Sequence, residues 1–257
     1  MRICLISTVL ALAFLGCSGE ETQWIAEPLP QEEAPIADLK PQEARRSYPW
    51  DAAAQAITKA HFRCKGSRLN PPRKTEKETF LDCGGFSEHS LPIKNEAEFI
   101  YPCLIEVLND LQTKTGKRVV ITTGHRCIQH HLYARTPEQG RASKHLIGGE
   151  VAFYLSGFEQ KPEAVVELIR EYYQKRFPNQ PEMQKWERYE KSDTDVSMQP
   201  WYNHEVFIKI YKPHEGRDLD NQHPFPYLRI QVRYDRDRKE KVTFNWGEAE
   251  KNIYKHY

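Results

Sequence analysis

Apolar residues recur at helical spacing in three segments of the chain. In each of them the apolar side chains fall on one side of a 3.6-residue period, which is typical of a helix that packs against a core. The pattern predicts a helix over residues 96–115, ended by Gly116, and a second helix over residues 162–176. A shorter pattern predicts a helix over residues 51–62, with Asp51 as its cap.

Short runs rich in β-branched and aromatic residues predict the strands. They alternate with polar segments, and two of them flank a strongly charged turn at residues 235–238, which predicts a hairpin there. The strands are expected at residues 117–122, 150–155, 204–211, 227–234 and 241–246.

The order of these elements predicts the fold class. Helices come early and antiparallel strands come late, which favours an α+β fold. We therefore expect one domain over residues 49–257, in which helices pack on one face of an antiparallel sheet. Residues 63–90 and 177–200 contain Gly, Pro or many polar residues and are expected to be irregular.

The first sixteen residues have the pattern of a secretory signal peptide. A positive start, Met1-Arg2, precedes an apolar stretch that is short for a membrane span. Gly16-Cys17 follows and resembles a bacterial lipobox, with Phe14 where leucine is usual. The resemblance implies cleavage before Cys17 and lipid on its sulfur, which would anchor the protein to a bacterial membrane on the periplasmic or extracellular side. The alternatives are a different cleavage point and an uncleaved anchor.

The composition narrows the class of protein further. Residues 17–48 are rich in Glu, Gln, Pro and Ala, which predicts an extended tether. The 257 residues contain 37 Lys and Arg against 36 Asp and Glu, so bulk charge argues against a nucleic-acid binder. No second apolar run of membrane-spanning length follows the N-terminus, which excludes a multi-pass transporter or channel.

Four cysteines remain after the signal peptide and the lipidation site. An even number of cysteines in an exported domain predicts two disulfides, and three pairings are open. The rival interpretation is a four-cysteine zinc site, which the absence of a Cys-x-x-Cys pair disfavours. The four residues are Cys64, Cys83, Cys103 and Cys127.

The side chains best suited to metal binding or catalysis gather in two stretches, residues 119–155 and 199–211. These stretches contain five of the ten histidines: His125, His130, His131, His145 and His204. A histidine at the end of a strand, with glycines that let backbones approach, is a plausible metal ligand. Adjacent histidines such as His130 and His131 are more often solvated loop residues.

The first stretch resembles the signature of the zinc D-alanyl-D-alanine metallopeptidases, whose fold is shared by peptidoglycan L,D-endopeptidases and the hedgehog signalling domain. That signature is a Ser-Gly-aromatic-Arg turn, followed after a loop by Ser-x-His-x-x-Gly-x-Ala-x-Asp. Here Gly124 and Arg126 match the turn, with His125 in place of the aromatic residue. Ser143 and His145 begin the second block, which Gly148 continues. The resemblance covers residues 96–211.

The resemblance implies roles for particular residues. His145 would bind zinc, and His204, on a later strand, would be the second histidine ligand. Arg126 would hold a substrate carbonyl or carboxylate, with Ser143 and Trp201 beside the substrate. Glu205 would be the candidate general base, although its neighbour His204 faces the other side of a regular strand.

The sequence departs from the family at the zinc-binding aspartate, which is Ala152 here. Glu150 lies two residues earlier, on the same face of a strand, and could replace the lost carboxylate. Three interpretations follow. The favoured one is an exported binding module with a degenerate zinc site, which binds peptidoglycan stem peptides or an envelope protein. The second is an active zinc peptidase rebuilt on His145, Glu150 and His204. The third is an exported scaffold with a chance resemblance.

Overall fold

The fold is taken from a computed structural model that describes residues 55–76, 78–135 and 142–250. The chain divides into two units, residues 1–46 and 47–257, and all described residues belong to the second. The expected signal peptide (1–16) and the expected tether (17–48), with Cys17, lie outside the described residues. Among the residues that are described, no helix is both long and apolar enough to cross a bilayer.

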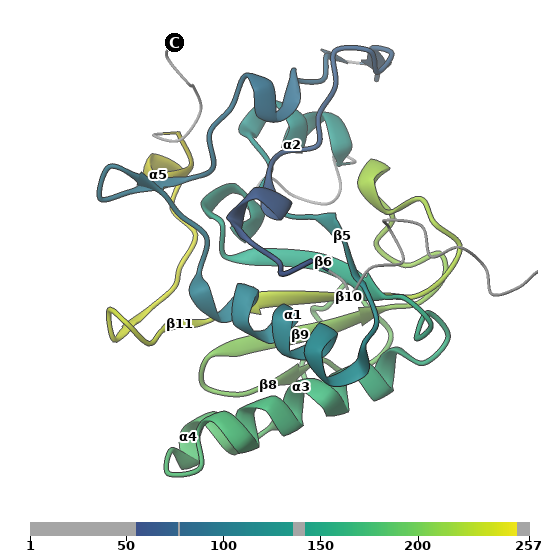
Figure 1. Cartoon of the computed structure of the whole chain (residues 1–257). Coiled ribbons are helices and arrows are strands. Elements are labelled where there is room, and N and C mark those ends of the chain that lie inside the picture. The colour runs from purple at the N-terminus through teal and green to yellow at the C-terminus, as the bar shows by residue number, and fades with distance from the viewer. Residues whose placement is uncertain (1–54, 77, 136–141, 251–257) are drawn as a thin grey trace, which may run out of the picture. The chain divides into compact units, whose positions relative to one another are not determined.

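A six-stranded sheet forms the centre of the domain (Figure 1). Its strand order is β5-β6-β10-β9-β8-β7, and every adjacent pair is antiparallel. The predicted α+β class with an antiparallel sheet is therefore confirmed. The strands are β5 Val119–Thr123, β6 Glu150–Leu155, β7 Glu187–Arg188, β8 Trp201–Tyr202, β9 Val206–Tyr211 and β10 Tyr227–Val232.

The two faces of this sheet differ in polarity because side chains alternate along each strand. One face presents buried apolar residues such as Phe153, Ile208 and Ile230. The helices α1 (Pro102–Thr115) and α3 (Pro162–Arg176) share the hydrophobic core with this face. The other face carries polar and charged residues, among them Glu150 and Arg229. The residues of the peptidase-like motif therefore lie on the face opposite the two long helices.

Local sequence explains where helix α1 begins and ends. Pro102 occupies its first turn, where a missing N–H costs nothing, and Gly116 closes it in the left-handed conformation with φ of 64°. The predicted start at residue 96 is wrong by six residues. Asn95 and Glu96 have φ values of 51° and 62°, because they form the turn of a short hairpin that precedes the helix.

A β-bulge between β5 and β6 changes which side of the sheet the end of β5 faces. Ile121 pairs with Phe153, but the next pair in register is Thr123 with Ala152. The extra residue, Thr122, shifts the alternation by one position. As a result Thr123 projects on the polar face, where its hydroxyl meets the charged side chains described below.

Two further predictions are corrected by the structure. The helix expected over residues 51–62 is, among the described residues, only the 3-10 turn η1 (Lys59–Phe62). The strand expected over residues 241–246 shortens to β12 (Glu240–Lys241), which pairs with β11 (Tyr234–Asp235) and not with β10. Helix α5 (Trp246–Glu250) follows it.

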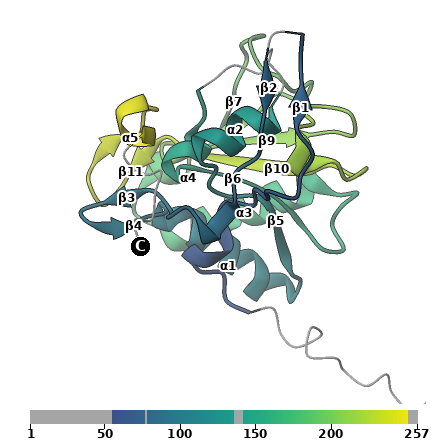
Figure 2. The ribbon, with the colours of Figure 1, turned by 90° about the horizontal axis from the view of Figure 1, so that it is seen from above.

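The remaining elements are short and lie around the sheet. The hairpin of β3 and β4 lies beside α5, as both ribbon views show (Figures 1 and 2). These elements are β1 Arg73–Lys74, β2 Thr79–Phe80, η2 Gly85–Ser87, β3 Ile93–Lys94, β4 Ala97–Glu98, α2 Ile128–Ala134, η4 Lys144–Ile147, α4 Pro181–Gln184 and η5 Leu219–Asn221.

The close approach of Gly124 to another backbone segment generates a stability prediction. In Gly124→Ala the added Cβ would lie 2.5 Å from both the Cα and the carbonyl oxygen of Phe62. Backbone atoms cannot move aside cheaply, so we expect a loss of ~3 kcal/mol in the free energy of unfolding. In Gly116→Ala nothing lies within 4 Å of the new atom, and only the left-handed backbone is penalised, by ~1 kcal/mol. Urea unfolding compares the two variants. Equal losses in the free energy of unfolding would contradict the close approach of Gly124 to Phe62.

Candidate functional site

Ser143 and His145 are positioned by the short 3-10 turn η4. Ser143 is the residue before the turn, and its Oγ accepts a hydrogen bond from the backbone N–H of His145 at 3.3 Å. Gly148 ends the turn with φ of 69°, a conformation that favours glycine. Strand β6 begins two residues later with Glu150, so the turn and the strand bring the three polar side chains together.

His145 and Glu150 face each other in the interior. The Nδ1 of His145 lies 2.6 Å from the carbonyl oxygen of Gly124, and because that oxygen can only accept, Nδ1 carries the hydrogen. The opposite nitrogen, Nε2, is 3.7 Å from Glu150 Oε1 and has no hydrogen-bond partner. Glu150 also accepts hydrogen bonds from the Ser143 hydroxyl at 3.1 Å and from Gln231 Nε2 at 2.9 Å.

A guanidinium lies beside Glu150, on the strand next to Ala152. Arg229 pairs with Ala152 across β10 and β6. Its Nε is 3.5 Å from Glu150 Oε1 and its Nη2 is 3.7 Å from Asp218 Oδ2. The guanidinium also lies over the ring of Tyr211, with 4.6 Å between its carbon and the ring centroid. Ala152 itself packs in a small cluster with Val196, Tyr211 and Tyr227.

Arg126, predicted to hold substrate, is instead bound to the protein's own carboxylates. Its Nη2 lies 2.7 Å from Asp218 Oδ2, and its Nε donates to Asp220 Oδ2 at 2.8 Å. Nη2 also donates to the Thr123 hydroxyl at 3.2 Å. Only 1% of the arginine is exposed. The predicted substrate-binding and catalytic role of Arg126 is therefore corrected: the residue anchors a buried charge network.

The network continues to a second histidine. His130 lies between Asp220, 3.1 Å from its Nε2, and Asp82, 2.6 Å from its Nδ1. Burial alone would lower the pKa of this imidazole, but the two carboxylates raise it to about 10. His130 is therefore a buried cation, and not the solvated loop residue expected from the sequence.

Opposite charges determine the protonation of the carboxylates. Burial would raise the pKa of Glu150, but the neighbouring His145 and Arg229 hold it well below its usual range. Burial likewise opposes ionisation of Asp218, and the guanidinium groups of Arg126 and Arg229 lower its pKa. For His145 burial dominates and lowers the pKa to about 4. The site thus consists of ionised carboxylates and guanidinium groups around a neutral His145.

The other predicted residues do not join this site. His204 is exposed, and its ring lies 4.1 Å from that of Tyr234. Among the described residues, three or more metal-ligating side chains come together at two places, and neither includes His145, Glu150 or His204. The predicted zinc triad is therefore not assembled.

Glu205 and Trp201 have structural partners of their own. Glu205 is fully buried, accepts a hydrogen bond from the Tyr173 hydroxyl at 2.8 Å and lies 3.5 Å from Arg236 Nε. It is therefore on the helix-covered side of the sheet, away from His145, and is not placed to act as a general base there. Trp201 is half-buried, and the guanidinium carbon of Arg188 lies 3.6 Å from its ring centroid.

The cysteines correct the prediction of two disulfides. All four are unpaired and buried. Cys103 lies in the main core on α1, apart from the others, whereas Cys64, Cys83 and Cys127 form a separate cluster. Their ligand atoms lie within 4.8 Å of one another, as do those of the overlapping set Asp82, Cys83 and His130. These buried groups could hold a metal ion.

Sequence reasoning missed this cluster because it treated the cysteines as disulfide partners. The signal that could have revealed it is the Cys-x-x-His spacing of Cys127 and His130, which places both residues on one face of the first turn of α2. Nothing in the sequence indicates that Cys64 and Cys83 join them, because they lie in an irregular segment.

Two neighbouring hollows open beside the buried motif. Their volumes are about 300 and 310 Å³, and both are lined by Lys144 and Arg233. Gln231, which donates to Glu150, lines the second, together with Tyr189 and Lys209. His204, Tyr234 and Lys241 line the first. The side chains that surround both hollows are predominantly basic and aromatic.

Comparison with known proteins finds no matching family model, no matching curated protein and no matching solved structure.

The buried charge network predicts a pH-dependent loss of stability. Asp218→Asn should lower the free energy of unfolding at about pH 7 by ~3 kcal/mol, because it removes the carboxylate that two buried arginines share. The folded-state pKa of Asp218 lies below the unfolded value of ~3.9, so its contribution is present above that pH and disappears as the pH falls through the folded-state pKa.

Urea unfolding at about pH 7 and about pH 3 tests this. The unchanged protein should lose more stability on acidification than Asp218→Asn. The exposed control Asp237→Asn should follow the unchanged protein. If Asp218→Asn and Asp237→Asn lowered the free energy of unfolding equally at about pH 7, the role of Asp218 would be contradicted.

Proposed function

We propose that this chain is an exported, lipid-anchored protein of the bacterial cell envelope, whose domain has a peptidase-like fold and binds peptidoglycan stem peptides without cleaving them. The order strand, loop, strand, helix, strand and the arrangement of Ser143, His145 and Gly148 support the peptidase-like fold. The signal-peptide pattern and Cys17 support export and anchoring.

The loss of hydrolysis rests on one observation, the position of Arg229. An ion that bound both His145 Nε2 and Glu150 Oε1 would lie close to Arg229, whose Nε is 3.5 Å from that same oxygen. Two like unit charges ~4 Å apart repel by roughly 4 kcal/mol at the effective dielectric of a protein, and a divalent ion doubles that cost. A zinc site also needs a third protein ligand, and Ala152 cannot supply it.

The two basic hollows support an anionic peptide as ligand. Stem peptides carry free carboxylates, which an exposed guanidinium binds with two parallel hydrogen bonds. Arg233 is exposed and lines both hollows, with its guanidinium 4.5 Å over the ring of Tyr202. Lys144, the residue next to His145, lines both as well. A peptide in these hollows would lie beside the buried motif and not in it, since only 1% of His145 and of Glu150 is exposed.

One observation favours the second candidate, an active zinc peptidase. The buried Nε2 of His145 has no partner, and its ring is oriented by a backbone carbonyl, as metal-bound histidines usually are. Zinc bound there would polarise a peptide carbonyl and activate water. This function requires His204 or another third ligand to approach, and Arg229 to withdraw.

Binding can be measured by calorimetry with the purified full-length protein and a synthetic stem peptide. We expect saturable binding that Arg233→Gln weakens about tenfold, the equivalent of ~1.4 kcal/mol. The matched control is Arg68→Gln, because Arg68 is exposed and, among the described residues, forms its ion pair with Glu88. The same peptide with amidated carboxyl groups should bind weakly to all three proteins. Equal affinity for the two peptides would contradict carboxylate recognition.

Hydrolysis is tested separately by mass spectrometry of the peptide after long incubation with the protein and added zinc. We expect no cleavage product, because Arg229 lies 3.5 Å from the Glu150 oxygen that would bind the ion. Product that forms with the unchanged protein and disappears in His145→Ala would overturn the binding-only function and establish the peptidase.

A further inference from the structure

Three cysteine thiols, from three separate segments of the chain, converge at one point. Cys64 follows η1, Cys83 precedes η2, and Cys127 precedes α2, so three separate segments each contribute one sulfur. All three side chains are buried, at 2%, 2% and 3% exposure. Because a disulfide joins only two sulfurs, this arrangement is not explained by disulfide formation.

The spacing of the sulfurs matches a metal–thiolate site. Sulfurs that surround a tetrahedral zinc ion at ~2.3 Å lie about 3.8 Å from each other. The Sγ atoms of Cys64 and Cys83 are 3.7 Å apart, and the third sulfur lies within 4.8 Å of both. Van der Waals contact would give a similar pairwise distance, so the convergence of three sulfurs carries more weight than any one distance.

Backbone N–H groups point at two of the three sulfurs. The backbone N–H of Gly85 donates to Cys83 Sγ at 3.3 Å, and that of His130 donates to Cys127 Sγ at 3.3 Å. His130 lies close by, held between Asp82 and Asp220, and its ligand atom is within 4.8 Å of Cys83 Sγ.

The backbone is also shaped around one of the sulfurs. A Cβ at Gly66 would lie 2.1 Å from Cys83 Sγ, so glycine is required for that sulfur to lie against the chain. A fourth donor is available beside the same sulfur, because a carboxylate oxygen of Asp82 lies within 4.8 Å of it.

We propose that Cys64, Cys83 and Cys127 bind one zinc ion as a structural site. Thiolates are the ligands that select soft and borderline ions such as zinc, and closed, fully protein-bound sites are typically structural. The ion would join residues 63–90, which have little regular secondary structure, to the end of β5 and the start of α2. This site is independent of the function proposed above, because it shares no residue with the His145 motif or with the basic hollows.

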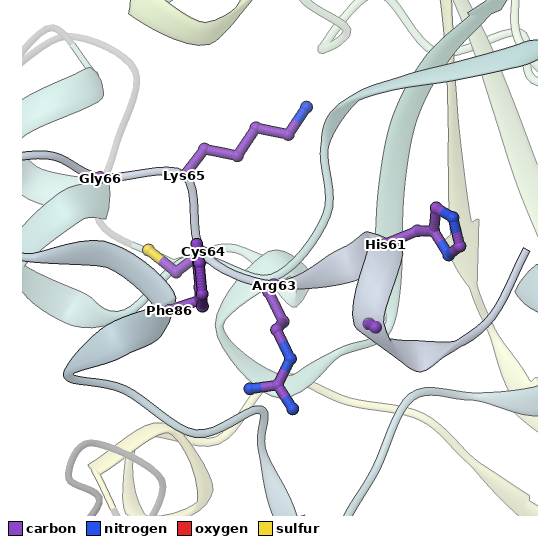
Figure 3. Close-up of a pocket in the computed structure, with 7 residues that line it drawn as sticks. His61, Arg63, Cys64, Lys65, Gly66 and Phe86 are labelled. Atoms are coloured by element: carbon purple, nitrogen blue, oxygen red, sulfur yellow. The ribbon is translucent and has the colours of Figure 1, made fainter. Parts of the chain in front are cut away.

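An ion can reach the cluster from one side. A hollow of about 760 Å³ is lined by Cys64 together with His61, Arg63 and Phe86. Figure 3 shows that His61, Arg63 and Lys65 extend in different directions, while the sulfur of Cys64 points away from His61. The lining side chains therefore do not converge on a ligand of their own in this hollow.

Elemental mass spectrometry of the full-length protein, purified without chelator and without oxygen, tests the proposal. We expect about one zinc ion per chain, lost in Cys83→Ser and retained in Cys103→Ser. Cys103 is the matched control because it is equally buried but lies in the main core, outside the cluster. His145→Ala should retain the zinc. Zinc lost in His145→Ala but kept in Cys83→Ser would overturn this inference and favour the peptidase.

A second measurement does not depend on a variant that folds. Cobalt added to the unmodified, metal-free protein should produce the intense near-ultraviolet absorption of thiolate–cobalt bonds, and one equivalent of zinc should abolish it. Zinc should also raise the melting temperature. An absence of metal uptake, with peptide mapping that shows two of the three cysteines joined as a disulfide, would overturn the proposal.

Discussion

The ion pairs of two buried arginines determine the character of the polar face of the sheet. Arg126 and Arg229 both approach Asp218, and Arg126 also binds Asp220 while Arg229 lies beside Glu150. Removing such charges from water is costly, and only close opposite charges offset that cost. The network therefore binds η5 to the end of β5 and to β10, and it keeps this face closed where a metallopeptidase would need an open, metal-bound cleft.

The polar face holds an oriented histidine. Ser143 Oγ accepts a hydrogen bond from the N–H of His145, and the carbonyl oxygen of Gly124 orients the imidazole, both of which are features that a metal ligand requires. Arg229 lies beside Glu150, and the basic side chains of Lys144 and Arg233 lie further out, where they line the two hollows.

A second constraint acts on the irregular segment between η1 and α1. This part of the domain contains only two-residue strands and single turns, so backbone hydrogen bonding alone holds it weakly in place. The three converging thiols, the hydrogen bonds of Asp82 to Ser67 and Asn70, and the cationic His130 link it to the sheet. A chain of polar contacts from Asp82 through His130 to Asp220 connects the cysteine cluster to the arginine network.

The sequence by itself determined the long elements. β6 and α3 begin and end where their apolar periodicity predicts, and the α+β class follows from their order, because local pattern governs which face of each element is buried. Only the tertiary structure decided the site. Strand register places Arg229 opposite Ala152, and the bulge after Ile121 helps decide which carboxylates meet Arg126. Loop paths decide that His204 stays exposed and that three cysteines converge. These contacts join residues up to a hundred positions apart, and no local pattern in the sequence encodes such distances.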